Sequence, residues 1–592
     1  MKKKILCLLL LLTLALSAFV ACGGNTNPTP DPDPDPDPIR PNPGDDDIIE
    51  EGDWWSAITY ENTELRFQMT HCSNNEQLSS GCERYLAGEN VTEPKDLDDL
   101  IATRNEDAYF NTNVTVKYLY YPDSPDSYGW TKNIDVIFNE VMDGASDSPD
   151  MYCNFMSDML TTSLKGSFAN LYSKVRGTGE QAGVNFIIPD AEIGNVGYAH
   201  SGYMSDLMSS LTLSSDKIYC IASDYFIDLI RAFFVIPVNR ALYNSIAPEM
   251  IEDLDGSGTK DMNDLFVEVE NGDWTYDRMI AYCGKIFKPT SGLANANIND
   301  TLGFALSNSD GLPASGLLYT TDIEIIQKTW SDEKGGYVYY YPGSTIDNFV
   351  NDDPEDLIHK RYSDVDYDAV NNNLFNFADK LTLLFQSRGV AIADGTAVRT
   401  SFTKDTMLFG GVILVGSLEY EYYQQMKGGE RGFGVLPLPL YKPASEYDDK
   451  FDGAWYQTQI HTIGRCGGIS HITTKFAQCT AFIQYQSTHS TDILNEYYDY
   501  NLTLDVSGDI GGNVKMLQYI RKNVRTAFDK LFEDAIGLFF QSIDGDSTAN
   551  RWHHRIMSAS YQLDMRGPYD ELKDVKQTRL LDLEAEYDRL PD

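Results

Sequence analysis

The chain has 592 residues and a formal net charge of −43, because 89 aspartates and glutamates outnumber 46 lysines and arginines. A surface this negative repels nucleic acids and anionic lipid headgroups, so these partners are excluded and neutral or cationic ligands are favoured. The 37 tyrosines provide aromatic faces with polar edges, against which neutral polar solutes such as sugars and peptides can stack.

The N-terminus carries a short targeting pattern. Lys2–Lys4 precede an apolar run from Ile5 to Val20, which is shorter than the ~20 residues of a membrane-spanning helix and is followed by small residues. This pattern is typical of a secretory signal peptide over residues 1–22. The stretch Phe19-Val20-Ala21-Cys22 resembles a bacterial lipobox, although Phe19 stands where an aliphatic residue is usual. We therefore expect lipidation of Cys22; a plain secreted protein is the alternative.

Residues 23–57 are expected to form a disordered Asp-Pro tether. Asp-Pro dipeptides repeat from Asp31 to Pro38. Proline fixes φ and lacks an N–H, and the aspartates repel one another, so the segment should be extended at ~3.1 Å per residue, on the order of 50 Å in all. Such a tether would hold a folded body away from the membrane.

Cysteine usage indicates no disulfide framework. With Cys7 in the signal and Cys22 lipidated, seven of the nine cysteines stay in the body, and none form a CxxC pair. An odd number favours buried free thiols over a disulfide scaffold or a zinc ribbon. Cys72 with Cys82, or Cys466 with Cys479, could still close a short loop.

Alternating strands and helices are predicted in the first part of the body. In chain order they are a strand at Leu65–Met69, a helix capped by Thr92, a strand at Asn113–Tyr121, a helix at Asn133–Met142 and a strand at Met151–Phe155. This alternation is typical of a parallel sheet covered by helices. The body of roughly 540 residues is too long for one core and suggests two lobes.

A first crossing between lobes is predicted at Phe233–Val238, where an apolar run contains Pro237 and a helix begins after it. Tyr-rich loops with a hairpin are expected over Gly336–Asp368. The further predicted elements are a helix capped by Thr275, strands at Leu302–Leu306, Met407–Ser417, Gly432–Leu440 and Gly467–Ile472, a helix stepping from Val514 to Leu531, and a mostly charged closing helix over Tyr569–Leu590.

Five segments follow one another as they do in a known family. They are the lipobox at Cys22, Phe233–Tyr243, Asn271–Asp277, Gly434–Pro439 and Gly468–Phe482. Over roughly Thr63 to Ala535 the chain resembles the extracellular solute-binding proteins of bacterial ABC importers, of the carbohydrate-binding type. The insert Tyr441–Arg465 and the closing charged helix have no counterpart in that resemblance.

The resemblance implies an α/β, two-lobed periplasmic-binding-protein-like (type II) fold with a hinge between lobes. Lobe 1 would hold residues 58–238 with 433–487, and lobe 2 would hold 239–432 with 488–592. It also implies a monomer, lipid-anchored on the extracytoplasmic face of the cell membrane, that captures an oligosaccharide and delivers it to ABC permease subunits without chemistry. A peptide binder, a surface glycoside-active enzyme and an adhesive surface protein remain alternatives, although the chain has no HExxH, GxSxG or P-loop pattern.

Ligand-binding side chains are expected where strands end and helices begin, because free N–H groups and loops point into a cleft there. Polar candidates, for which ordinary turn chemistry is the alternative, are Ser73, Asn74, Asn75, Asp224 and Tyr225. Aromatic candidates that could stack on a sugar ring, or simply pack in a core, are Trp130, Tyr420, Trp455 and Tyr456.

A calcium-loop pattern precedes one predicted helix. Oxygen-bearing side chains stand at loop positions 1, 3, 5, 9 and 12, with Gly258 at position 6: Asp253, Asp255, Ser257, Asp261 and Asp264. Asp264 is shorter than the usual glutamate, and Lys260 replaces an apolar residue. Structural calcium is the one cofactor suggested; an acidic turn capping the next helix is the alternative.

Overall fold

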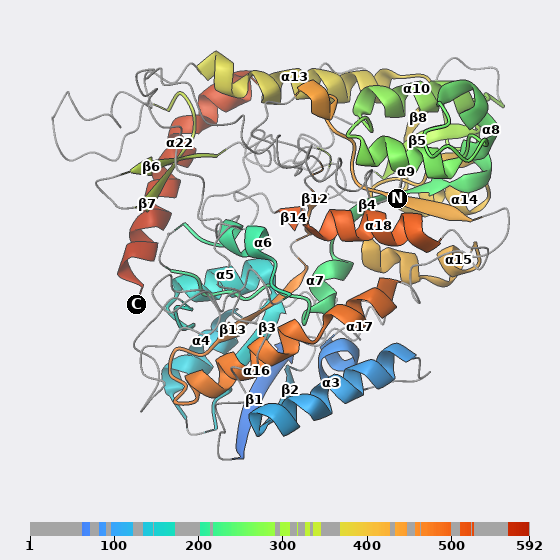
Figure 1. Cartoon of the computed structure of the whole chain (residues 1–592). Helices are drawn as coiled ribbons and strands as arrows, with labels where there is room; N and C mark the ends of the chain where they lie inside the picture. The colour runs from blue at the N-terminus through green and yellow to red at the C-terminus, as the bar shows by residue number, and fades with distance from the viewer. Residues whose placement is uncertain are drawn as a thin grey trace, which may run out of the picture. The chain divides into compact units, whose positions relative to one another are not determined.

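The structure is a computed structural model (Figure 1). It describes residues 62–70, 82–89, 96–121, 134–145, 147–171, 202–213, 217–290, 296–307, 317, 326–331, 336–344, 367–426, 432–446, 456, 458–461, 463–498, 510–522, 524–525 and 566–590. The predicted signal peptide, the lipidation site Cys22 and the tether lie outside these residues.

The first sheet has four strands in the order β13-β3-β1-β2. Its strands are β1 (Thr63–Thr70), β2 (Val114–Tyr121), β3 (Met151–Phe155) and β13 (Arg465–Ile469). Leu65, Phe67 and Met69 alternate along β1 and are fully buried, as the period of two in the sequence requires. β1 pairs in parallel with β2 and β3, whereas β13 runs antiparallel to β3. The three strands predicted in the first part of the body are confirmed.

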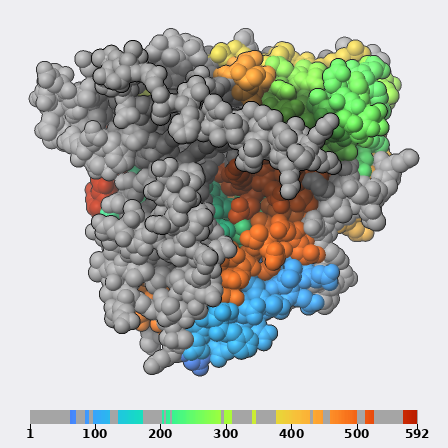
Figure 2. All heavy atoms as spheres, viewed as in Figure 1, coloured from blue at the N-terminus to red at the C-terminus, as the bar shows by residue number. Residues whose placement is uncertain are grey.

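Helices that accompany this sheet come from both ends of the chain. They are α3 (Asp96–Thr112), α4 (Ile134–Asp143), α5 (Met156–Leu164), α16 (Phe476–Thr488) and α17 (Thr491–Glu496). α16 and α17 both pack on α3. Figure 2 shows the blue atoms of α3 adjoining the orange atoms of these late helices on one face. We call the first sheet and these helices the first half. It is completed by residues far downstream of α3, as the hydrogen bond from Arg104 to Ser490 (sequence separation 386) illustrates.

The second sheet has six strands built around β5. Its strands are β4 (Phe234–Asn239), β5 (Leu302–Ser307), β8 (Val390–Ala393), β9 (Met407–Phe409), β10 (Ile413–Leu414) and β11 (Phe433–Leu436). β5 pairs in parallel with β8 and β9. β4 runs antiparallel to β9, β10 and β11. The single strand predicted at Met407–Ser417 is two short strands, followed by a 3₁₀ turn at Val415–Glu419.

The second sheet and the helices that pack on it form the second half. These helices are α8 (Arg240–Met250), α9 (Met262–Glu270), α10 (Tyr276–Ile286), α13 (Tyr367–Gln386), α14 (Gly395–Thr403), α15 (Glu421–Gln424) and α18 (Ile510–Lys522). The Thr275 side chain accepts a hydrogen bond from the Arg278 N–H and caps α10 as predicted. α10 approaches β5 so closely that a Cβ on Gly303 would lie 2.2 Å from the Cys283 Cα, so only glycine fits there.

Several short elements and the long closing helix α22 complete the described chain. They are a π-helical turn at Cys82–Ala87, α6 (Ser205–Ser210), α7 (Ile227–Arg231), β6 (Gln327–Ser331), β7 (Gly336–Tyr340), a 3₁₀ turn at Ala444–Glu446, β12 (Thr458–Gln459), β14 (Val524–Arg525) and α22 (Arg566–Arg589). β6 and β7 form the antiparallel pair expected near Gly336, but it begins earlier, at Gln327. The helix predicted from Val514 to Leu531 ends at Lys522, and it is wrong at Val524, which pairs with Thr458 as a strand. Residues 526–531 lie outside the described residues.

The two sheets share one strand order. In the first sheet, the order β13-β3-β1-β2 places β1 between β3 and β2, and β3 pairs with the antiparallel strand β13. In the second sheet, the order β4-β9-β5-β8 likewise places β5 between β9 and β8, and β9 pairs with the antiparallel strand β4. The α/β fold class with two sheets is thus confirmed. The sequence prediction places residues up to Val238 and from Phe433 onward in lobe 1. In the structure Val238 and Phe433 belong to β4 and β11, which lie in the second sheet.

The buried hydrophobic side chains of the described residues form one continuous cluster that includes strands of both sheets. Residues Asp47–Asp592 accordingly form one compact unit. The two sheets are thus distinct, and their buried side chains meet at a packed junction.

Candidate functional site

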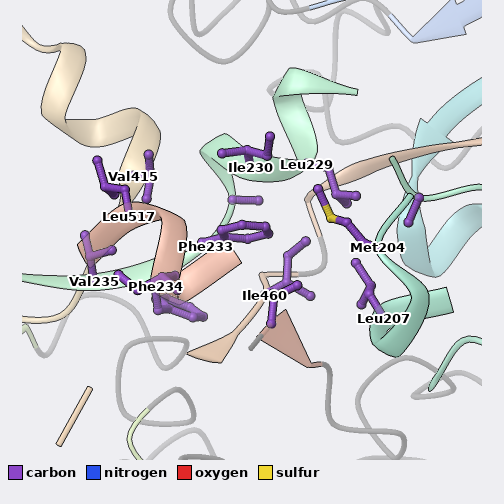
Figure 3. Packing of buried hydrophobic residues seen from close by; sticks show 14 of the residues in the cluster. Met204, Leu207, Leu229, Ile230, Phe233, Phe234, Val235, Val415, Ile460 and Leu517 are labelled. Carbon is purple, nitrogen blue, oxygen red and sulfur yellow. The ribbon is translucent and has the colours of Figure 1, made fainter. Parts of the chain in front are cut away.

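Two chain segments that pass between the sheets run side by side. Residues 232–234 lead from α7 into β4, and residues 460–461 precede β13. Phe233 forms a β-bridge with Ile460, and His461 donates its backbone N–H to the Ala232 carbonyl at 2.9 Å. Figure 3 shows Phe233 beside Ile460 and below Ile230 of α7. Any turning of one half against the other must act on this junction.

Apolar side chains surround the junction. Leu207 of α6 and Met204 lie near Ile460, while Val415 and Leu517 of α18 lie on the other side of Phe233 (Figure 3). All of them are buried. Since α18 also packs on β11 and α9, these contacts attach the crossing segments to the second half.

A buried charge network ties the junction to both sheets. Asp228 accepts hydrogen bonds from Arg231, one turn later on α7, at 2.7 Å and from Arg465 of β13. Arg231 donates through Nε and Nη2 to Glu419 at 2.8 and 3.0 Å. Arg231, Arg465 and Asp228 are only 1%, 3% and 8% exposed. Bidentate charge-assisted bonds of this kind fix geometry, and here they hold α7 and β13 at the points where the two crossings join the first sheet.

The aromatic residues around Arg231 complete this network. The Arg231 guanidinium lies over the Tyr85 ring at 5.4 Å, and the Tyr497 hydroxyl donates to Glu419 at 2.6 Å. Burial disfavours the Asp228 anion, but the opposing attraction of Arg465 and Arg231 is larger and lowers the pKa of its carboxyl below the ordinary value. The two guanidinium groups therefore favour the charged form of Asp228.

Asp224, a predicted ligand-binding residue, lies next to the junction and is 2% exposed. Its carboxylate accepts from Arg521 in the last turn of α18, at 2.6 Å to Nε and 2.5 Å to Nη2. Burial raises the pKa of Asp224 to about 6, against the opposing effect of Arg521. Since the adjacent Ile221 bridges to Gly467 of β13, the pair joins the first sheet to a helix of the second half.

Tyr225, the neighbouring candidate, is fully buried. Its ring lies 4.9 Å from the Arg104 guanidinium carbon, and its hydroxyl lies 3.2 Å from that of Tyr118. Burial raises the pKa of the Tyr225 phenol. In this arrangement its faces are occupied by protein, and its role in ligand binding stays a prediction.

Tyr420 is half-buried and part of an aromatic stack. Its ring lies parallel to that of Tyr422, with centroids 5.3 Å apart and planes at 9°. The Arg399 guanidinium carbon lies 4.7 Å from the Tyr422 centroid. Tyr420 directly follows Glu419 of the charge network, so this stack stands beside the junction. A ring with one face braced in this way suits stacking against a sugar.

The other predicted ligand residues lie elsewhere. Tyr456 is 1% exposed, and its hydroxyl accepts from the Trp274 backbone N–H at 3.1 Å, so it packs inside the protein. Ser73, Asn74, Asn75, Trp130 and Trp455 lie outside the described residues.

The predicted calcium loop brings three carboxylates together. Oxygen atoms of Asp253, Asp255 and Asp264 lie within 4.8 Å of one another. Each carboxylate also accepts backbone N–H bonds within the loop, and Asp264 is the N3 residue of a capping box that begins α9 at Asp261. Ser257 donates its hydroxyl to the Thr259 carbonyl. Both the calcium loop and the capping turn therefore fit the geometry.

Calcium is expected to stabilise the protein through this loop. Millimolar calcium should raise the free energy of unfolding by about 1–2 kcal/mol if the ion binds the folded loop alone. Asp253→Asn should abolish the gain, whereas Glu252→Gln, outside the carboxylate trio, should keep it. Thermal unfolding with calcium, magnesium or a chelator measures this. Equal melting temperatures in calcium and chelator would leave the loop as a helix cap.

Sequence reasoning missed the partners that organise the junction. Arg231, Arg465 and Arg521 are single arginines with no local motif, and only the fold brings them to their carboxylates. Tyr422 had a signal, because Glu419–Tyr423 is an unusually tyrosine-rich run after a strand.

In the part of the chain that the structure describes, no helix is long and apolar enough to cross a membrane. No protein-family model matches the chain, and no curated protein matches it.

Comparison with solved structures finds three representative similarities at low sequence identity. The galacto-N-biose-/lacto-N-biose I-binding protein of the ABC transporter from Bifidobacterium longum is 12% identical, with 89% of this chain and 98% of that chain covered and a TM-score of 0.43. The sugar-binding protein MalE from Xanthomonas citri is 10% identical, with 89% and 100% covered and a TM-score of 0.47. A probable secreted solute-binding lipoprotein from Streptomyces coelicolor is 12% identical, with 89% and 99% covered and a TM-score of 0.42. Because all three TM-scores are below 0.5, these similarities do not support a function, and the proposal below rests on the residues and the topology.

Proposed function

We propose that this chain is a solute-binding protein that captures a neutral polar molecule, most simply an oligosaccharide, between its two halves. The observation that carries the proposal is the repeated strand order of the two sheets, linked by two crossing segments that lie side by side. Such a junction lets two rigid halves turn about a short axis and close on a ligand. A net charge of −43 favours an uncharged ligand over an anion.

The half-buried stack of Tyr420 and Tyr422 supports a sugar as the ligand, because a braced aromatic face binds the apolar side of a sugar ring. The protein would perform no chemistry on the ligand. We further propose that Cys22 anchors it by lipid on the extracytoplasmic face of the membrane, and that an ABC permease receives the solute from the closed form.

A panel of oligosaccharides and peptides tests the proposal directly. An oligosaccharide that binds the folded state should raise the melting temperature in a concentration-dependent way and be recovered unchanged. Release of reducing ends would show a glycoside-active enzyme instead. Stabilisation by peptides alone would reassign the solute.

Tyr420→Ala is expected to weaken binding of the solute found in that panel about tenfold, which is about 1.4 kcal/mol of lost stacking. Tyr109→Ala is the matched control, because Tyr109 is exposed on α3 and stacks only on Phe110 among its described ring contacts. Isothermal titration calorimetry of both variants measures the effect. Unchanged affinity in Tyr420→Ala would remove this ring from the site.

A further inference from the structure

The closing helix α22 is mostly charged, yet it has one continuous buried side. Buried side chains recur along it in steps of three, four and seven residues: Tyr569, Lys576, Leu580, Leu583, Tyr587 and Leu590. This is the spacing of a helix packed along its whole length. Its contacts therefore show what the helix is attached to.

The C-terminal end of α22 is held by the first half. Lys217 is 9% exposed, and its ammonium donates to the carbonyls of Tyr587, Asp588 and Leu590 at 3.3, 3.4 and 2.9 Å. A lysine here satisfies carbonyls that a helix end leaves unpaired and complements the helix dipole. The Tyr587 hydroxyl also donates to the Leu211 carbonyl at 3.4 Å.

The segment that carries Lys217 pairs with residues of the first half. The Ile218 carbonyl accepts from the Leu171 N–H at 2.7 Å, and Ile221 bridges to Gly467 of β13. The Lys217 ammonium therefore fastens the last turn of α22 to the first half.

The N-terminal end of α22 is held by the second half. The Tyr569 ring meets Phe375 of α13 edge-on, with centroids 6.2 Å apart. α13 packs on β8 and on α10, and its Lys380 pairs with Asp277 of α10 at 2.6 Å. The Tyr569 hydroxyl also donates to the Pro342 carbonyl at 3.1 Å.

Between its ends, α22 covers the free edge of β7. Gln577 Oε1 accepts the Tyr341 N–H at 2.7 Å, and Glu584 Oε1 accepts the Tyr339 N–H at 3.2 Å. Ser344 donates to Asp574 at 2.8 Å. Figure 1 shows α22 running past β6 and β7 from the neighbourhood of α13. These bonds hold the middle of the helix against the β6–β7 pair and the residues that follow it.

We propose that α22 is a brace that joins the two halves away from the crossing segments and limits how far they can turn against each other. Eighteen residues separate Tyr569 from Tyr587, so a stiff rod of about 27 Å lies between the two attachments. Its link to solute capture rests on the proposed function; the brace itself is a mechanical property of the free protein. A fixed span at this side would set the size of solute that the closed form encloses.

Lys217→Met tests the brace, because it removes the ammonium and keeps an apolar stem. Spin labels on keto-bearing noncanonical residues at Phe110 of α3 and Leu383 of α13, both exposed, report the distance between the halves in solute-free protein. We expect the distance distribution to broaden roughly twofold, and amide exchange in the last turn of α22 to quicken at least about tenfold. Lys573→Met, which removes an ammonium that pairs with Asp570 inside α22, should behave as wild type.

An unchanged distance distribution together with a released last turn would overturn the proposal, because α22 would then be a surface helix without mechanical effect. If Lys217→Met does not fold, Tyr587→Phe removes the hydroxyl that donates to the Leu211 carbonyl and carries the same expectation on a smaller scale. Since no solute enters these measurements, a failed brace and a failed solute panel are separate results.

Discussion

Replacing Asp228 with alanine is expected to lower the free energy of unfolding by about 3–5 kcal/mol, the cost of leaving buried charges without their partner. Arg231 would keep Glu419, but Arg465 would lose its buried ion pair with Asp228. Urea unfolding at neutral pH, with the slope compared between variants, measures the loss.

The matched control for this prediction is Asp277→Ala. Asp277 also accepts from a cation, Lys380, but it is 61% exposed, so its loss should cost less than about 1 kcal/mol. Equal losses of unfolding free energy in the two variants would mean that the buried ion pairs of the junction stabilise the fold no more than an exposed pair does.

The second large effect is a pH dependence carried by Asp224. Its pKa is about 6 in the folded protein against an ordinary 3.8, so the folded state binds this proton more tightly than the unfolded state does. The contribution of Asp224 to stability is therefore fully present below about pH 4 and is lost as the pH rises through 6. Each pKa unit is worth about 1.4 kcal/mol, so the change should approach 3 kcal/mol.

Asp224→Asn supplies the comparison, because the amide is neutral at every pH. The stability of wild type minus that of Asp224→Asn should fall between pH 4 and pH 6 and stay level from pH 7 to 8. If this stability difference rises with pH instead, the attraction of Arg521 outweighs burial, and the pKa of Asp224 lies below its ordinary value.

Local signals in the sequence predicted local structure well. The alternation along Leu65–Met69 and the Thr275 cap each depend on a few adjacent residues, and both appear in the structure. Val524 was assigned to a helix because its spacing from Val514, Leu517 and Ile520 suits one, and its pairing with Thr458 could not be read from those neighbours. A tertiary contact here outweighs local periodicity.

The candidate site was harder to predict than the fold. Asp224 was chosen because it follows an apolar run, yet its partner Arg521 lies 297 residues away. The sequence indicated where polar side chains lie, but it did not show which of them form ion pairs within the protein. Tyr420 was predicted because it lies beside a loop at a strand end; the structure adds its stack with Tyr422, and its role in binding stays a prediction.

The pairing of β13 with β3 has a consequence for biosynthesis. β3 ends at Phe155, but its antiparallel neighbour does not begin until Arg465, so the first-made sheet waits for most of the polypeptide to leave the ribosome. The first sheet therefore reaches its full strand complement only when the later part of the chain has been made, and its earliest layer is completed late in folding.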